Sequence, residues 1–505
     1  MTVCEQKGRR LSLNLLSDPW LPVRRDGAQA VIRPCEIAEP SVSRLDWPRD
    51  DLNLAGIELL IGLLFLADPP WDDADWHERY DGPDPDRLQT AFAPFAPYFE
   101  LAGEGSRFLQ DRESFETAAK AGNIRPPDML FLDSAGENAA KHNADLMVRR
   151  GRYPSLPLPL AAMALYTLQA FAPGGGAGNR TSMRGGGPMV TLVRPRDGGT
   201  HSLWRRVWAN VPQGQPLSPD QAERALPWLR PTRTSERQQT VTPDMSHPAE
   251  AFFGMPRRLR LVFGGRSVTG VVQQRYGTNY AGWIHPLSPY YRPKPETEWL
   301  PCHPRPGRAS YRNWLGLTFG EGSETRRVAR TVDRFQKLTN APRWEVEAGG
   351  WAMDNMKPLD FVLHVYPVFR LDDEAEIRVA QCVEAANAAS TALSRALRQA
   401  VAIGGRAADL IREALFTDTE PAFVRAVRAV VAGDGETVEE AWLATLREVT
   451  LSAFDLHAVS ALPDRDVARV EQAIAARRAL LGTFTRPTGV RQILGLPDRP
   501  PEPRP

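Results

Sequence analysis

Two glycine clusters with arginines between them are the part of this sequence best suited to contact a phosphate-bearing ligand. The clusters fall within residues 174–178 and 185–187, and Arg180 and Arg184 lie between them. Glycine loses much backbone entropy on folding, but it lets the main chain adopt positive φ and approach a ligand closely. The guanidinium of arginine matches the geometry of a phosphate. The segment therefore predicts a loop that brings main chain against a nucleic acid or a nucleotide.

This loop differs from the phosphate-binding loops of NTPases, which need Gly, four residues and then Gly-Lys-Ser/Thr. Counting from Gly174, the last three positions hold Asn179, Arg180 and Thr181, so the second glycine and the lysine are both missing. The glycine spacing also does not fit a dinucleotide-binding fingerprint. The apolar run at 189–193 indicates a strand that would hold the end of the loop. A nucleotide-binding enzyme and a flexible surface loop remain as alternatives.

Patterns that would indicate catalysis or metal binding are weak. The eight histidines are scattered, without an H-E-x-x-H motif or an adjacent His-Asp pair, and no G-x-S-x-G motif occurs. The four cysteines, at positions 4, 35, 302 and 382, form no C-x-x-C pair, which argues against a zinc ribbon. We therefore expect no enzymatic activity, no bound metal and no cofactor.

Length and charge limit the class of protein. A chain of 505 residues exceeds one ordinary core, so two or more domains are expected. The net charge is +1, whereas a free-standing DNA-binding protein is usually more basic. Contact with nucleic acid would then be local or shared with basic partners, which favours a subunit of an assembly. The polar first residues, and an apolar run at 52–67 that is short and contains Glu58, predict a cytoplasmic protein without signal peptide or membrane span.

Helix and strand signals alternate through the first 370 residues. Alternating or β-branched runs predict strands at 20–23, 30–33, 189–193, 257–263 and 359–371. Arg258 and Arg260 would share the exposed face of the strand at 257–263. Apolar spacing predicts helices at 50–67, 84–101 and 160–172. Asp50 or Asp51 would cap the first of these helices.

The composition changes after residue 371, where alanine, arginine and leucine replace glycine and proline. Helices are expected at 373–403, 407–431, 436–457 and 464–482. Their short connections predict an antiparallel four-helix bundle. The predicted fold class is therefore α+β, with a mixed N-terminal domain at 1–370, a four-helix bundle at 371–486 and a proline-rich tail at 487–505.

Several motifs, in order along about the whole chain, resemble the CasA family, the large subunit of the type I-E CRISPR surveillance complex Cascade. The resemblance is carried by the glycine loop with the run at 188–193, the opening segment 13–23 and the Trp-Pro-Arg-Asp-Asp motif at 47–51. His-Pro-Leu-Ser-Pro at 285–289 and Gly-Gly-Trp at 349–351 follow in the expected order. The family's fold, an α+β domain followed by a four-helix bundle, agrees with the pattern of elements.

The resemblance implies that the glycine loop faces the minor groove of the protospacer-adjacent motif (PAM) in duplex DNA. The implied DNA-contacting residues are Gly174, Gly175, Gly176, Ala177, Gly178, Arg180, Arg275 and Gln273. Arg180 would contact a backbone phosphate, while Arg184 would brace the loop internally. Alignment on Thr269 and the glycine after it puts Arg275 where the family has a minor-groove lysine, with Gln273 as the alternative. The plainer interpretation of Arg275 is a basic residue on an exposed strand.

The resemblance also implies a wedge and an anchor. Counting from Gly349 places the tip of a strand-separating hairpin at Asp354, Asn355 and Met356, where Met356 could act as an apolar wedge. Relatives often present Asn-Gln at such a tip, so this sequence departs from the pattern. In the loop at 130–143, the positions that would anchor the subunit to the guide RNA's 5′ handle and to a neighbouring subunit are Phe131, Leu132 and Asp133. An exposed Phe-Leu pair would need such a partner, and the alternative is a loop packed on its own core.

The implied function is that of a non-catalytic large subunit that recognises the PAM, starts strand separation and supports recruitment of a helicase–nuclease. Its partners would be the other Cascade subunits, the CRISPR guide RNA, double-stranded target DNA and that helicase–nuclease, with no membrane. The alternatives are a nucleotide-binding enzyme that uses the glycine-rich loop, and the large subunit of another CRISPR subtype.

Overall fold

The computed structural model describes residues 12–134, 141–142, 149–176, 178–196, 202–307, 310–318, 324–341, 343–433, 437–460, 466–486 and 488–497. The chain divides into two compact units. The first comprises Met1–Pro306, Glu321–Thr339 and Glu347–Leu363, and the second comprises Gly307–Gly320, Asn340–Val346 and His364–Pro505. Helices and strands are both abundant, which confirms the predicted α+β fold class. The second unit also takes in two segments that precede residue 371.

The N-terminal segment forms a small antiparallel sheet in the order β2–β1–β3. Strands β1 (Leu21–Arg25) and β2 (Ala28–Ile32) are joined by a turn in which Asp26 and Gly27 have φ of 50° and 78°. Strand β3 is Val42–Leu45. Strands β1 and β2 correspond to the strands predicted at 20–23 and 30–33.

Two apolar helices, α1 (Asp50–Ala67) and α5 (Leu158–Phe171), pack against each other in the core of the first unit. Both are buried over most of their surface, so neither needs a polar face. The predicted cap of α1 is wrong: its N-cap residue is Arg49, and Asp50 and Asp51 lie in the first turn. There the carboxylate of Asp51 forms an ion pair with Arg49, with 2.8 Å between Asp51 Oδ2 and Arg49 Nη2.

Short helices connect the other elements of the first unit. They are α2 (Asp73–Asp81), α3 (Pro85–Phe92), α6 (Leu203–Trp208), α7 (Glu250–Phe253) and α9 (Arg330–Leu338). The helix expected at 84–101 ends at Phe92, and the prolines at 94 and 97 leave a 3-10 helix at Ala93–Tyr98. Proline lacks the N–H that an α-helix interior requires, which explains the early end.

A second sheet has the order β4–β7–β6 and comprises β4 (Leu156–Pro157), β7 (Ser267–Gln274) and β6 (Arg258–Gly264). The expectation that Arg258 and Arg260 share an exposed face is wrong. Arg260 is only 1% exposed and pairs with Glu116 at 2.7 Å, while Arg258 pairs with Asp111 at 2.6 Å. Carboxylates from the segment 111–116 cover that face, and alternation within the strand alone could not reveal this cover.

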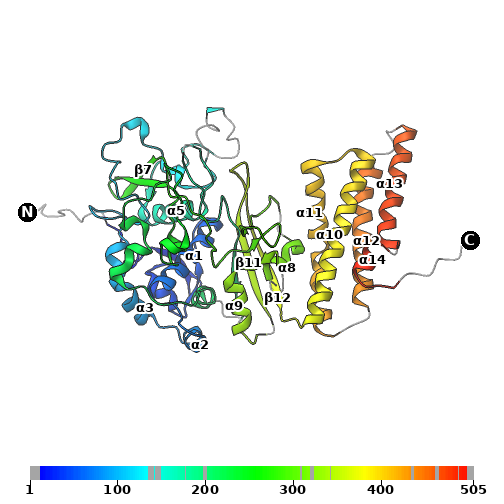
Figure 1. Ribbon diagram of the computed structural model, residues 1–505, viewed down its shortest axis with the longest axis horizontal. Helices are drawn as coiled ribbons and strands as arrows, with labels where there is room; N and C mark the ends of the chain where they lie inside the picture. Colours follow the sequence, from blue (N-terminus) through cyan, green and yellow to red (C-terminus); the bar gives the residue numbers. More distant parts are fainter. Residues whose placement is uncertain are drawn as a thin grey trace, which may run out of the picture. The chain divides into compact units, whose positions relative to one another are not determined.

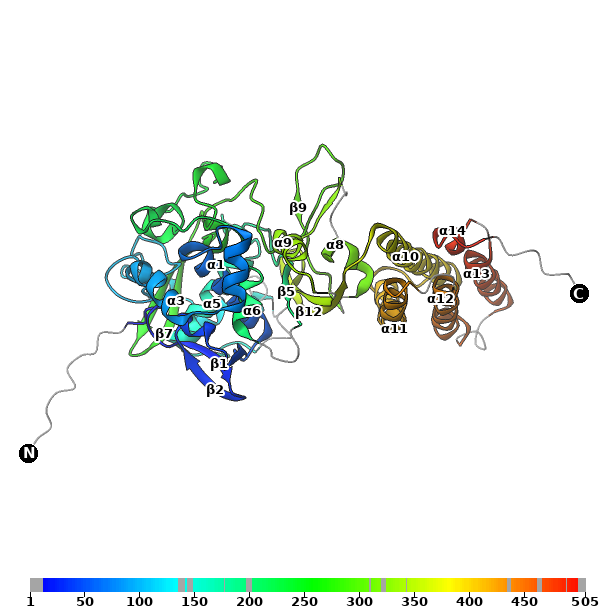
Figure 2. The ribbon, with the colours of Figure 1, turned by 90° about the horizontal axis from the view of Figure 1, so that it is seen from below.

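A long antiparallel hairpin is formed by β11 (Arg343–Asp354) and β12 (Lys357–Phe369) (Figure 1). Strand β5 (Val190–Arg194) pairs with the other edge of β11. The turn of the hairpin consists of Asn355 and Met356, which is where the count from Gly349 put a hairpin tip. A smaller sheet joins β8 (Tyr290–Tyr291), β9 (Leu300–Pro301) and β10 (Arg326–Arg327). Strand β9 lies in a pair of chain segments that extends as a narrow loop in Figure 2.

The second unit is dominated by four long helices that lie side by side in Figures 1 and 2. They are α10 (Asp373–Val401), α11 (Gly405–Val431), α12 (Val438–Phe454) and α13 (Val467–Thr485), which confirms the predicted C-terminal helices. Leu393, Leu397, Leu415, Phe454 and Leu480 form part of their common core. The short helices α8 (Trp314–Thr318) and α14 (Val490–Ile493) complete the unit, and α14 lies within the range predicted to be a tail.

Over the described ranges, none of the helices combines the length and the apolar character that crossing a membrane requires.

Candidate nucleic-acid interface

The glycine loop leaves the end of α5 and returns to β5 as an ordered turn closed by main-chain hydrogen bonds. The N–H of Gly175 donates to the Asn179 carbonyl at 3.1 Å, and the N–H of Asn179 donates to the Gly176 carbonyl at 2.7 Å. Lower in the loop, the N–H of Ser182 donates to the Ala172 carbonyl at 2.9 Å. The loop is therefore a defined main-chain shape, as close approach to a ligand would require.

Two glycines of the loop use positive φ for different reasons. Gly178 has φ of 77°, and a Cβ there would stand 2.8 Å from the main-chain nitrogen of Tyr276, so the position is closed to side chains. Gly176 has φ of 64°, but a Cβ there would meet nothing within 4 Å. Residues 175 and 176 are both exposed. The tip of the loop therefore presents bare main chain to open space, while its far side packs against the protein. Ala177 lies outside the described residues.

Arg184 anchors the loop from inside, which confirms its predicted bracing role. It is 2% exposed, and its Nη2 lies 2.6 Å from Oε1 of Glu58 on α1. Its Nη1 donates to Ser288 Oγ at 3.2 Å and lies 3.4 Å from Nδ1 of His285. Burial and the charge of Arg184 hold the pKa of His285 well below its usual value, so the ring stays neutral. Burial raises the pKa of Glu58, against the opposing effect of Arg184.

The second predicted contact region meets the glycine loop directly. The side-chain amide of Gln273, near the end of β7, donates to Asn179 Oδ1 at 2.7 Å. The N–H of Gly277 donates to the Gly178 carbonyl at 3.1 Å. Between them, Arg275 is exposed, and no ion pair links it to any carboxylate of the described residues. The structure therefore brings Gln273, Arg275 and the loop together, although they are about 95 residues apart in the sequence.

Arg180 is held at the edge of the loop rather than projecting freely. Its Nε donates to Ser235 Oγ at 2.8 Å, and the residue is half-buried. One nitrogen of the guanidinium is thus used to orient it, which leaves the remaining donors of the fork for another acceptor.

The hairpin tip also reaches the glycine loop. Asn355 and Met356 have φ of 45° and 63°, the conformation that a tight two-residue hairpin turn requires. Positive φ is an unfavourable backbone conformation for a residue as large as methionine. Met356 is 47% exposed. A Cβ at Gly174 would lie 3.4 Å from Met356 Cγ. Asp354 is exposed, and its carboxylate accepts a hydrogen bond from the Asn355 amide at 3.0 Å.

Of the three predicted anchor residues, Asp133 is half-buried, whereas Phe131 and Leu132 lie inside the protein, so their expected exposure is wrong and the alternative of packing on the protein's own core holds for them. They are 3% and 4% exposed, and the Phe131 ring stacks on Tyr153 with centroids 4.6 Å apart. Asp133 pairs with Arg152 at 2.8 Å and with Arg49 at 3.1 Å. Burial alone would raise the pKa of Asp133, but hydrogen bonds from both arginines outweigh it and lower that pKa. Further along this loop, positions 135–140 and 143 fall outside the described ranges.

Sequence reasoning missed the residues that hold the loop from beneath. Arg257, directly before β6, donates from Nη2 to the Pro173 carbonyl and is 7% exposed. Tyr276 packs against Gly178, and Asn179 accepts from Gln273. The pair Arg257-Arg258 was visible in the sequence, but nothing in its spacing pointed to a loop about 80 residues away.

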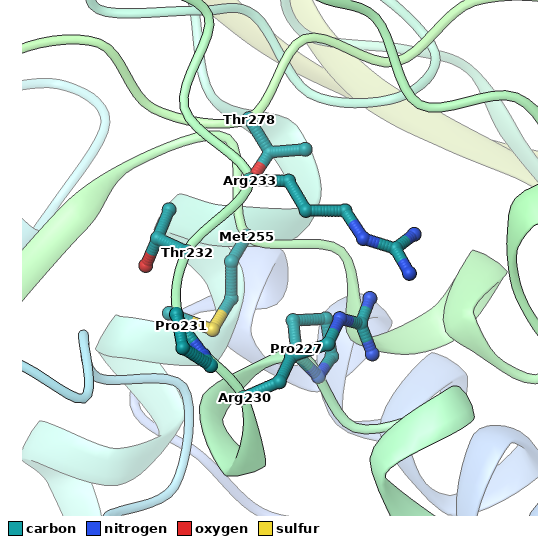
Figure 3. Close-up of a pocket in the computed structure, with 7 residues that line it drawn as sticks. All are labelled: Pro227, Arg230, Pro231, Thr232, Arg233, Met255 and Thr278. Atoms are coloured by element: carbon teal, nitrogen blue, oxygen red, sulfur yellow. The ribbon is translucent and has the colours of Figure 1, made fainter.

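A small hollow lies beside the same region, lined by Arg230, Arg233 and Thr278 among others (Figure 3). The two guanidinium groups point to the same side of the hollow in Figure 3. Its cavity volume is about 10 Å³, far below the roughly 300–1,000 Å³ typical of small-molecule sites. Over the described part of the chain, no group of three or more His, Cys, Asp or Glu side chains is arranged to hold a metal ion.

The chain is therefore an α+β protein that combines a unit with an ordered glycine loop and a C-terminal bundle of four helices. The chain belongs to the CRISPR-associated protein Cse1 family, whose family model matches residues 14–453. This confirms the resemblance drawn from the sequence motifs.

Solved structures of this family share the fold. CasA of Thermus thermophilus superposes with a TM-score of 0.72 at 19% identity, over 93% of this chain and 99% of that chain. Cse1 of Thermobifida fusca gives a TM-score of 0.67 at 18% identity, over 96% and 98%. A chain of a CRISPR RNA-guided surveillance complex gives 0.67 at 17% identity, over 94% and 100%. At these identities the likeness shows the fold alone.

Proposed function

We propose that this protein is the large, non-catalytic subunit of a type I-E CRISPR RNA-guided surveillance complex, and that it recognises the PAM in double-stranded DNA. Membership of the Cse1 family and a fold shared with a chain of such a complex support the assembly role. A single observation carries the PAM-reading role. The loop that presents the bare main chain of residues 175–176 is contacted by Gln273 and Tyr276, which flank the exposed Arg275, and by Met356 at the hairpin tip.

The groups in this set suit a minor groove. That groove presents few distinguishing donors and acceptors, so readout there depends on width and on close approach. Gly176 can approach base edges because no side chain projects from it. Arg275 would enter the groove, where negative potential attracts a guanidinium, and Arg180, oriented by Ser235, would contact a backbone phosphate.

The hairpin tip would begin strand separation. Minor-groove proteins often insert an apolar side chain between base steps, which costs a few kcal/mol per unstacked step. Met356 is apolar, exposed and placed at the turn of a long two-stranded hairpin, so it is the best candidate for that insertion, with Asn355 and Asp354 beside it. The guide RNA would then pair with the opened strand, and the opened complex would recruit a helicase–nuclease.

The loop that starts at Phe131 would contact the guide RNA's 5′ handle and a neighbouring subunit. Because Phe131, Leu132 and Asp133 are buried or ion-paired within the chain, they would act by fixing the start of that loop and not by touching the partner themselves.

The experiment that tests the proposal is PAM selection by the assembled complex. The chain is reconstituted with guide RNA and the other subunits, and binding is measured on duplex targets whose flanking bases are randomised. We expect one short flanking motif to be enriched, and the enrichment to disappear with the Gly176→Val variant. A complex that binds all flanking sequences equally would refute PAM reading. Tight ATP or GTP binding by the chain would favour the nucleotide-binding enzyme.

A further inference from the structure

One buried arginine of the first unit has no carboxylate partner among the residues that the structure describes. The buried arginines of the described chain are Arg79, Arg184, Arg257, Arg260 and Arg491. Four of these pair with a carboxylate within 3 Å, as Arg184 does with Glu58 at 2.6 Å and Arg260 with Glu116 at 2.7 Å. Arg257 has no such pair with any described residue, and its Nε is buried without a hydrogen-bond acceptor. A buried charge without a partner is costly and therefore unusual.

Arg257 lies directly beneath the glycine loop. Its Nη2 donates to the Pro173 carbonyl, and a Cβ built on Gly175 would stand 3.0 Å from its Nη1. Gly175 is itself exposed, so only the main chain of this one residue lies between the guanidinium of Arg257 and the outer side of the loop. Two main-chain hydrogen bonds with the Gln169 side chain, of 3.0 and 3.1 Å, hold Arg257 in this place.

The side chain keeps its charge in this position. Burial lowers the pKa of Arg257 to about 10, which is still well above neutral pH. Its field reaches the outer side of the loop with little screening, because the intervening space is filled by protein rather than by salt solution. The loop tip therefore presents a positive potential that no side chain at the tip supplies.

We propose that Arg257 is a positioning residue whose positive charge is neutralised only when duplex DNA lies on the outer side of the glycine loop. The free protein bears the cost of the unpaired charge, and the negative groove and phosphates of the DNA supply its counter-charge. Glycine at position 175 is then required for a second reason, since any side chain would push the guanidinium away from the ligand. This inference rests on the proposed PAM-reading function and adds a residue to it.

The charge is tested with Arg257→Met, which keeps the aliphatic length and removes the cation. In the assembled complex we expect affinity for PAM-bearing duplex to fall on the order of tenfold. The slope of log K against log salt should decrease by about 1, as for the loss of one phosphate-neutralising charge. Binding to a pre-opened, single-stranded target should not change. The thermal midpoint of the free chain should stay level or rise, because an unpaired buried charge has been removed.

Arg260→Met serves as the matched control. It removes a buried arginine three residues away that does have a carboxylate partner, so it should lower the thermal midpoint and leave the salt slope unchanged. Arg257→Lys tests the charge in a second way. A buried lysine loses its proton more readily than arginine, so it should restore duplex binding at low pH and lose it as pH rises.

The outcomes separate this inference from the function on which it rests. If the wild-type complex shows no PAM preference, the proposed function fails. If it shows that preference and Arg257→Met binds duplex with the same affinity and salt slope, only the role of Arg257 fails. A fall in thermal midpoint parallel to the loss of binding would show a structural role and overturn the inference, as would a defect confined to guide-RNA binding.

Discussion

The side chain of Met356 lies against Gly186: a Cβ built on Gly186 would stand 2.9 Å from the Met356 sulfur. The same Cβ would be 3.1 Å from Pro173 Cα, at the start of the glycine loop. The second glycine cluster therefore makes the room in which the hairpin tip rests beside the first cluster. Met356, proposed to separate the strands, thus packs against the loop that is proposed to read the DNA, since a Cβ at Gly174 would also lie 3.4 Å from its Cγ.

Gly186→Ala should show whether strand opening depends on the packing of Met356 against Gly186. The added methyl group must displace Met356 or the loop, and overpacking of this kind typically costs about 1–3 kcal/mol of unfolding free energy. We expect a matching loss of strand opening next to the PAM. Gly105→Ala is the control, since a Cβ there meets nothing within 4 Å and no positive φ is needed. If the two variants unfold and open DNA alike, the packing of tip and loop is not important.

Gly176 and Gly178 should respond differently to substitution. A side chain at Gly178 collides with the main chain of Tyr276, so Gly178→Val should destabilise the protein as well as abolish duplex binding. Gly176→Asn should leave stability within about 0.5–1 kcal/mol, because asparagine tolerates positive φ and the space is open. It should nevertheless abolish PAM-dependent binding if main chain touches the groove there. Thermal unfolding and binding to duplex and single-stranded targets measure the two effects.

The sequence predicted the helices of the second unit from local periodicity, whereas the place of the hairpin tip came from the family resemblance, by counting from Gly349. Alanine-rich periodic segments and short connections mark α10 to α13, and the Asn355 position suits a turn with positive φ. Burial of Phe131 and of Arg260 could not be predicted, because each depends on residues far away in the chain. Arg49 and Arg152 enclose Asp133 beside Phe131, and Glu116 covers Arg260.

The exposed, positively charged side chain of Arg275 should contribute to the affinity for PAM-bearing duplex. Arg275→Ala is expected to lower affinity for PAM-bearing duplex by about 1–3 kcal/mol if the guanidinium enters the groove. Since the side chain is exposed, the stability of the free chain should change by less than about 0.5 kcal/mol. Arg266→Ala, on the turn between β6 and β7, is a control for general loss of charge. Equal effects of the two variants would remove Arg275 from the site and favour Gln273.

Acid should weaken the anchor of the glycine loop. Burial, aided by the charge of Arg184, lowers the pKa of His285 well below its usual 6.5. The unfolded chain then binds a proton at a pH where the folded chain does not, so stability is present above about pH 6.5 and is lost as pH falls. The free energy of unfolding then changes by up to about 1.4 kcal/mol per pH unit for each such proton. His285→Gln should reduce the slope between about pH 7 and 5, whereas His77→Gln, at an exposed site, should not.

Replacing Asp354, Asn355 and Met356 with three glycines should separate recognition from opening. Initial engagement of the PAM should stay nearly intact, since Arg275 and the main-chain hydrogen bonds that close the glycine loop remain. Opening of linear duplex should slow, because unstacking a base step costs a few kcal/mol and the partly exposed Met356 would occupy the vacated space. A pre-melted bubble beside the PAM, or negative supercoiling, supplies that energy independently, so the defect should be small on such DNA. Permanganate reactivity of thymines beside the PAM measures opening directly. Met356→Ala alone should reproduce most of the defect, while Asp354→Asn should not. If the triple variant opens linear duplex at the wild-type rate, strand separation begins elsewhere on the protein.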